Sequence, residues 1–209
     1  DQEVTDRFLP PRHASIKLDT EKPVTIGTLT LPDYYSEFKR QQEEAMRNVP
    51  EVFTEVTREF ANAVGRSYAR YVPFGLEDAK VAVVSLGSAS GTIRWVARNL
   101  RKQGLPVGAL KIATYRPFPH EEIGRLLENL DVVIVLERAL SIGSHTGPLA
   151  SDIVCSLYNR SREPKVLDIV AGLGGRDISP DSIEKIFRTG LEATKRPTGL
   201  EMEFVGVRE

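Results

Sequence analysis

The stretch of residues 81–96, VAVVSLGSASGTIRWV, begins with an apolar run, turns through glycine and serine, and continues in a helical pattern. An apolar run of this length that ends in a turn predicts a strand buried on both faces of a sheet. The small residues after it allow a tight connection from strand to helix. The stretch is therefore typical of an α/β fold, and its turn resembles a phosphate-binding loop in composition.

The same alternation of strand and helix continues toward the end of the chain. Apolar runs predict strands at 80–86, 107–114, 131–137 and 165–170, and helical spacing predicts helices at about 90–103, 119–129, 147–159 and 180–189. The sequence Ser179-Pro180-Asp181 is a helix-start signal, and Gly104 stands where a left-handed residue often ends a helix. Residues 77–209 are therefore predicted to form a three-layer α/β/α domain with a mainly parallel sheet.

Residues 1–76 follow a different pattern. Prolines and polar residues up to about residue 33 indicate an extended arm, with one possible strand at 24–31. From Tyr35 to Val64 the apolar residues recur three and four positions apart, as on one face of a helix. Pro50 lies inside this pattern and either kinks one long helix or begins a second. We expect an extended arm and a helical linker ahead of the α/β domain.

Charge and composition argue against several classes of function. The 209 residues include 28 basic and 29 acidic side chains, so no broad positive field favours nucleic acid or an anionic membrane. No apolar run reaches the roughly 20 residues that span a bilayer, and the N-terminus lacks the pattern of a signal peptide, so we expect a cytoplasmic protein. The single cysteine, Cys155, is expected in the core, and alone it cannot hold an iron–sulfur cluster. Because the chain begins with Asp1, we expect it to be part of a larger protein.

The loop after the first apolar strand is the first candidate site. Its small residues would let backbone amides approach a phosphate, and they are equally suited to a tight structural turn. The loop matches neither G-x-G-x-x-G nor G-x-x-x-x-G-K-[ST], the two specific nucleotide-binding patterns. Both interpretations therefore stay open for Gly87, Ser88, Ser90 and Gly91.

Two further loops follow predicted strands and carry polar residues. Because ligands of open α/β sheets bind at the carboxyl ends of the strands, these loops are candidates for a site or for a subunit contact. Their candidate residues are Glu137, Arg138, Ser144 and His145 in the first loop and Arg176 and Asp177 in the second. The three histidines lack metal-ligand spacing, and no G-x-S-x-G nucleophile pattern occurs, so neither a metal nor a catalytic serine is expected.

Taken together, several segments resemble a known enzyme family. The segment GLPVGALKIATYRPFPHEEIGRLLENLDVVIVLER at 104–138 is similar to the C-terminal domain of transketolase-like thiamine-diphosphate enzymes, with Arg116-Pro117 and Glu137 at the ends of two strands. Across nearly the whole chain, the order of motifs resembles the alpha subunit of the pyruvate:ferredoxin oxidoreductase family, also called pyruvate synthase. The motifs are RFLPP at 7–11, PVTIGTLTLPDYYSEFKRQQEEAM at 23–46, SLGSASGT at 85–92, GPL at 147–149 and GLGGRDIS at 172–179.

The resemblance implies a role in a complex that converts a 2-oxo acid, with pyruvate the first choice, into acyl-CoA, carbon dioxide and reduced ferredoxin. It implies thiamine diphosphate, Mg, [4Fe-4S] clusters and coenzyme A on other domains or subunits, and an oligomeric assembly. This segment has no G-D-G pattern followed by a paired asparagine, so it is expected to supply no catalytic acid or base and to bind no cofactor by itself. Arg116 and the polar residues of the two later loops then become interface candidates.

Two alternatives remain beside this interpretation. One is a free-standing small-nucleotide-binding module that uses the loop from Gly87 to Gly91. The other is an oligomerisation module without a ligand. In both alternatives the α/β fold is the same, so the fold alone does not separate them from an assembly domain of an oxidoreductase.

Overall fold

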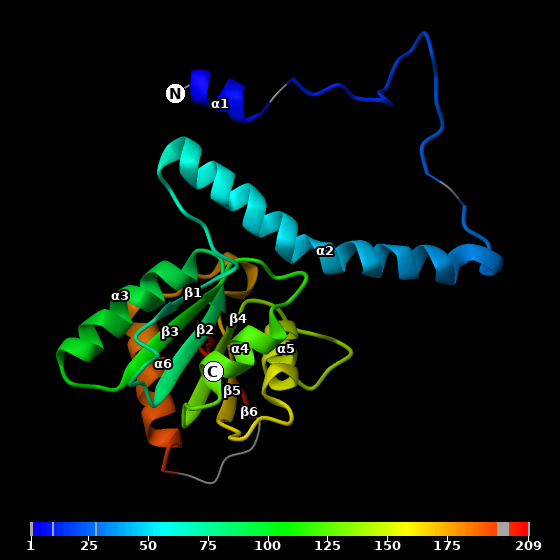
Figure 1. The fold of residues 1–209 in the computed structure, drawn as a ribbon. Coiled ribbons are helices and arrows are strands. Elements are labelled where there is room, and N and C mark those ends of the chain that lie inside the picture. Colours follow the sequence, from blue (N-terminus) through cyan, green and yellow to red (C-terminus); the bar gives the residue numbers. More distant parts are fainter. Residues whose placement is uncertain (1, 10, 28, 196–200, 209) are drawn as a thin grey trace. The chain divides into compact units, whose positions relative to one another are not determined.

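The computed structural model describes residues 2–9, 11–27, 29–195 and 201–208 (Figure 1). The chain divides into two compact units, residues 1–69 and residues 70–209. The division falls before the segment YVPF, because that segment forms a strand of the sheet in the second unit.

The first unit consists of two helices and an extended connection. Helix α1 spans Gln2–Phe8 and was not expected from the sequence. The ring of Phe8 meets that of Phe60 edge-on, with 5.5 Å between ring centroids. The strand expected at 24–31 is absent from residues 24–27 and 29–31, which the structure describes as irregular chain. A single stretch without a neighbouring strand leaves its backbone groups unpaired, so alternation alone is not enough to form a strand.

Helix α2 spans Pro32–Val64 and is one long helix that continues through Pro50. Proline removes one backbone donor from the ladder and crowds the preceding turn, and Figure 1 shows α2 changing direction within its length. No residue of α2 is buried, although one face carries large apolar side chains. Its left-handed cap at Gly65 returns a backbone hydrogen bond to Ala61.

The second unit is built on a six-stranded sheet in the order β1-β3-β2-β4-β5-β6. All neighbouring strands are parallel except β1, which runs antiparallel to β3. The strands are β1 (Tyr71–Phe74), β2 (Val81–Leu86), β3 (Val107–Ile112), β4 (Val132–Glu137), β5 (Lys165–Val170) and β6 (Glu201–Phe204).

Four helices cover the two faces of this sheet (Figure 1). They are α3 (Ala89–Lys102) and α6 (Pro180–Ala193) on one face, and α4 (His120–Leu127) and α5 (Pro148–Leu157) on the other. A short 3-10 turn, η1 (Leu173–Gly175), precedes α6. The predicted three-layer, mainly parallel α/β/α architecture is confirmed.

Two apolar layers hold the helices to the sheet. Alternate residues of β2 point to opposite faces, so Val83 packs with α3 and α6 while Val84 packs with α4 and α5. Phe187 of α6 is fully buried in the first layer, and Ile153 of α5 is fully buried in the second. Burying side chains of this size contributes about 1.5–3 kcal/mol each, which fixes the helices on the sheet.

The helix ends follow the sequence signals closely. Ser179 accepts a hydrogen bond from the Ser182 amide at 3.2 Å, which satisfies one free donor at the start of α6. Gly104 has φ of +82° just after α3, as expected for a residue that ends a helix. No helix within the described ranges is both long enough and apolar enough to cross a lipid bilayer.

The prediction of a buried Cys155 is wrong. The thiol is exposed because α5 buries Ile153 and Ser156, and Cys155 points away from the side that meets the sheet. Its segment is apolar as a whole, but helical geometry separates its residues onto different faces.

Candidate functional site

The strand order creates a switch point between β2 and β4. From β2 the chain passes through α3 to β3 on one side, whereas from β4 it passes through α5 to β5 on the other side. The connections therefore leave the carboxyl ends of β2 and β4 in opposite directions. Crevices of this kind are where open α/β sheets bind ligands.

Three loops meet at this switch point and line a pocket of about 320 Å³. The first loop leads from β2 into α3, the second follows β4, and the third follows β5 and leads to α6. The polar side chains in the lining are Ser88, Thr92, Arg138, Arg176 and Asp177. Four of these, Ser88, Arg138, Arg176 and Asp177, were candidates from the sequence, and the fold brings them together although they lie up to 89 positions apart in the chain. Thr92 was not foreseen, because it stands inside the helical pattern.

Arg138 reaches across from the end of β4 toward the loop after β5. A Cβ atom added to Gly172 would lie 3.1 Å from the Arg138 Nε, so the arginine lies over this glycine. Gly172 also has φ of +72°, a backbone conformation that favours glycine. Within the described part of the chain, the Arg138 side chain has no hydrogen bond or ion pair.

Arg176 enters the same pocket from the other side. Its Nη1 donates a hydrogen bond to the Gly206 carbonyl oxygen, which ties the loop to the end of the chain beyond β6. Asp177 lines the pocket beside it. The pocket thus combines two guanidinium groups and one carboxylate from loops that are separate in sequence.

The other small residues of the first loop have different surroundings. The Ser90 hydroxyl lies 2.9 Å from that of Ser85 and is turned toward the sheet. Ser90 and Gly91 line a second cavity of about 170 Å³, together with Arg94 and Lys111. Gly87 is exposed and has φ of +67°, so it supplies the turn itself. The loop does not gather its small residues around one ligand-sized space.

Glu137 is buried, and it caps a helix rather than facing the pocket. Its Oε1 accepts a hydrogen bond from the Ala150 amide at 2.8 Å, in the first turn of α5. Asp168 on the neighbouring strand β5 accepts one from the Gly147 amide at 2.7 Å. Burial raises the pKa of both carboxyl groups, and the negative charge of Asp168 raises the pKa of Glu137 further. The sequence prediction did not single out Asp168. The signal that could have identified it is an acidic residue inside the apolar strand KVLDIV.

Arg116, Ser144 and His145 lie outside the pocket lining. Arg116 forms an ion pair with Asp152 at 2.9 Å and stands over the Tyr115 ring, 4.1 Å from its centroid. Ser144 is exposed and accepts a hydrogen bond from the Thr146 amide at 3.3 Å. His145 is exposed.

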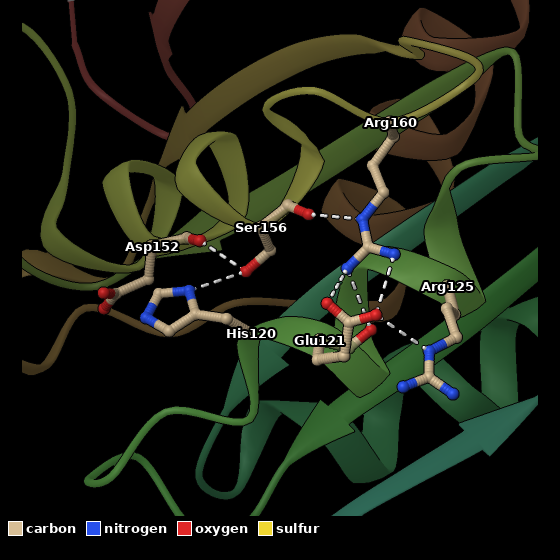
Figure 2. Close-up of polar contacts among 6 residues, drawn as sticks. All are labelled: His120, Glu121, Arg125, Asp152, Ser156 and Arg160. Carbon is tan, nitrogen blue, oxygen red and sulfur yellow. Dashed lines mark hydrogen bonds and ion pairs between the residues drawn. The ribbon is translucent and has the colours of Figure 1, made fainter.

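A polar network joins α4 to α5 (Figure 2). The Ser156 hydroxyl donates to the Asp152 carbonyl oxygen at 2.7 Å, so its oxygen is left to accept the 2.9 Å hydrogen bond from His120 Nδ1. Arg160 binds the Glu121 carboxylate at 2.7 Å. Because the Ser156 hydroxyl is buried and already donates to the backbone, this serine–histidine pair holds two helices together and is not an activated nucleophile.

Side chains that commonly bind metal ions do not cluster within the described residues. No group of three or more histidine, cysteine, aspartate or glutamate side chains among the described residues could hold a metal ion. The buried carboxylates of Glu137 and Asp168 are already used by the amides of α5. The one cysteine cannot supply the thiolates of a cluster.

Comparison with known families assigns the chain. A family model described as pyruvate:ferredoxin oxidoreductase core domain II matches residues 79–183, half of the chain. The chain belongs to this family. The matched residues run from the start of β2 into α6, so the family covers the switch point and its three loops.

Curated relatives of this family extend the similarity to the first unit. The pyruvate synthase subunit PorA of Thermotoga maritima is 44% identical over 192 residues, which cover 92% of this chain and 48% of that protein. PorA of Methanosarcina barkeri is 34% identical over 210 residues, covering 100% of this chain and 52% of that protein. The ketoisovalerate oxidoreductase subunit VorA of Pyrococcus horikoshii is 36% identical over 187 residues, which cover 88% of this chain and 47% of that protein. The chain therefore spans about half the length of the curated relatives it matches.

Proposed function

We propose that this chain is part of the alpha subunit of a 2-oxo acid:ferredoxin oxidoreductase and that it serves the assembly of that complex. The observation that carries the proposal is the 44% identity to a pyruvate synthase subunit over 92% of the chain. The complex would decarboxylate a 2-oxo acid oxidatively and deliver acyl-CoA, carbon dioxide and reduced ferredoxin. Thiamine diphosphate, Mg, the clusters and coenzyme A would be bound by its other domains and subunits.

The chemistry of this chain supports an assembly role over a catalytic one. Its buried carboxylates accept hydrogen bonds from backbone amides, and its buried serine–histidine contact joins two helices. These groups stabilise the fold and are not free to exchange protons with a substrate. Polar side chains without a partner among the described residues, such as Arg138 and Asp177, lie at the carboxyl edge of the sheet, where an adjacent domain could contact them.

Helix α2 supports the same role from the first unit. Tyr35, Phe38, Val52 and Val56 lie on one face of it and are each 45–56% exposed. A row of large apolar side chains on a long helix with no buried residue is typical of a surface that another polypeptide covers. We infer that the remaining half of the alpha subunit or a neighbouring subunit covers this face.

Pyruvate is the substrate we propose for the complex. The two pyruvate synthase subunits cited above are 44% and 34% identical to this chain, and the first of these values exceeds the 36% identity of the subunit named for ketoisovalerate. These identities overlap, so a branched-chain 2-oxo acid is the second candidate. A substrate panel on the assembled complex, with pyruvate, ketoisovalerate and 2-oxoglutarate, would rank them by kcat/KM.

Reconstitution tests the assembly proposal directly. The chain alone, supplied with thiamine diphosphate, Mg²⁺, coenzyme A and pyruvate, should not reduce ferredoxin or a viologen dye. Coexpression with the remaining parts of the oxidoreductase should give a stable complex that does. Full activity of the chain alone, or of the complex without it, would overturn the proposal.

A further inference from the structure

The pocket at the switch point brings together charged side chains from separate loops. Two arginines from different loops line one cavity of about 320 Å³, and the described residues give the Arg138 side chain no hydrogen-bonding or ionic partner. A guanidinium group carries five donors in a planar fork that fits the oxygens of a carboxylate or a phosphate. Such a group, left free in a cavity beside a second one, offers unfilled donors to an anion.

The fold brings both arginines to the cavity. Arg138 lies over Gly172, and a Cβ atom added to this glycine would be 3.1 Å from the Arg138 Nε. Arg176 is fixed by its hydrogen bond to the Gly206 carbonyl oxygen. The hydrogen bond of Arg176 places one guanidinium group in advance, which lowers the entropy lost when an anion binds there.

The third wall of the cavity adds donors of the same kind. Ser88 and Thr92 line it from the start of α3, and both carry hydroxyl groups. Ser88 precedes the helix without making a side-chain cap hydrogen bond, so the first amides of α3 are not satisfied by it. These amides and the hydroxyls add to the two cations, while Asp177 contributes the one negative charge in the lining.

We propose that this pocket binds the phosphate group of a small ligand through Arg138 and Arg176. The donors come from three sides, which suits a tetrahedral oxyanion with several acceptor oxygens better than a planar carboxylate. The volume is at the lower end of the 300–1,000 Å³ range of small-molecule sites, so the ligand is a compact phosphorylated compound. The carboxylate of Asp177 would accept a hydrogen bond from a hydroxyl or amine of the same ligand.

Inorganic phosphate is the probe for this site. Titration of the full chain, labelled with ¹⁵N, should shift amide signals of residues 88–92 and 172–178 together, with one dissociation constant. The variant Arg138→Gln should weaken this binding by about tenfold or more, because it removes a charge-assisted contact. Arg176→Gln should do the same, and it serves as the second variant if the first does not fold.

Arg162→Gln is the matched control, because it removes the same charge from an exposed arginine. Arg162 pairs with Asp131, which precedes β4 and lies at the opposite end of the strand from Arg138. Phosphate binding should be unchanged in this variant. Equal losses in all three variants, or shifts spread over the whole surface, would mean a general charge effect and would overturn the proposal.

Two further measurements separate the possible ligands. Acetate should bind at least about tenfold more weakly than phosphate. Equal or tighter acetate binding would assign the pocket to a carboxylate, such as an acidic side chain of a neighbouring polypeptide, and would overturn the phosphate assignment. Phosphate binding should not depend on Mg²⁺, which distinguishes it from a thiamine diphosphate site and leaves the reconstitution test independent.

Discussion

Glu137 on β4 and Asp168 on β5 are two buried carboxylates that together cap one helix. Asp168 accepts a hydrogen bond from the Gly147 amide at 2.7 Å, and Glu137 accepts one from the Ala150 amide at 2.8 Å. The amides belong to the first turn of α5 or to the residue before it, where helix geometry leaves donors without partners. Two strands and one helix are thus tied together by acidic side chains, at buried strand positions where the apolar pattern would predict apolar residues.

The first prediction concerns the second oxygen of Asp168, which is buried and has no hydrogen-bond partner among the described residues. Asp168→Asn keeps an acceptor for the Gly147 amide and removes the buried charge. The free energy of unfolding of this variant should therefore be higher than that of the parent, or lower by at most about 1 kcal/mol. Asp168→Ala leaves that amide unsatisfied and should cost about 1–3 kcal/mol. Urea denaturation measures both values. If asparagine is as costly as alanine, the charge itself is needed for the cap.

The second prediction concerns the pH dependence of stability. Burial raises the pKa of Glu137 and of Asp168 above the values of these groups in the unfolded chain. At pH values between the unfolded and the folded pKa, the folded chain therefore binds more protons than the unfolded chain. Their contribution to stability is therefore full below the unfolded carboxyl pKa of about 4 and is lost as the pH rises through the folded pKa values. The stability of the double variant E137Q/D168N relative to the parent should therefore increase as the pH rises above about 4.

Glu121→Gln provides the control with the opposite sign. Its hydrogen bond from Arg160 lowers the pKa of the Glu121 carboxyl, so its contribution is present above the unfolded pKa and disappears as the pH falls. The difference between this variant and the parent should shrink on acidification. Parallel pH profiles for the parent and E137Q/D168N would show that the buried pair titrates normally.

The third prediction uses two glycines that both stand inside helices. A Cβ atom at Gly124 in α4 would collide with the Ser156 carbonyl oxygen of α5, which is backbone and cannot easily move away. Gly124→Ala should therefore destabilise the fold by about 1–3 kcal/mol. Gly91→Ala in α3 meets no atom within 4 Å, and alanine favours helix there by up to about 1 kcal/mol, so this variant should be neutral or stabilising. Thermal unfolding compares the two, and a reversed order would contradict the packing.

Sequence patterns predicted the central part of the fold well. The apolar runs that became β2, β3, β4 and β5 are long, continuous and bounded by turns, so buried parallel strands were the natural interpretation. The parallel topology then explains why three distant loops meet at one edge of the sheet. Arg138 and Arg176 could be named as candidates because each follows such a strand.

The edges of the sheet and individual side-chain roles were harder to predict. Strand β1 is four residues long and contains Pro73, and its register with β3 depends on a pairing far away in the sequence. Cys155 and Glu137 show the same limit for single residues. Apolar neighbours suggested a buried thiol, whereas the Cys155 side chain is exposed. The end of a strand made Glu137 a candidate for a site or a contact, and only tertiary packing reveals that it is buried and caps α5.

The last prediction tests the apolar face of α2. Phe38 and Val52 are 50% and 54% exposed, so replacing both with serine removes little burial within this chain. The free energy of unfolding should change by less than about 0.5 kcal/mol, as is usual for surface positions. Retention of the chain in the reconstituted oxidoreductase should nevertheless fall, because the apolar area that a partner covers is lost. Glu37→Ser, on the same helix but in its polar pattern, should leave retention unchanged. Equal retention of all three proteins would show that α2 binds its partner through another face, whereas a large loss of stability would mean that the face is buried within this chain itself.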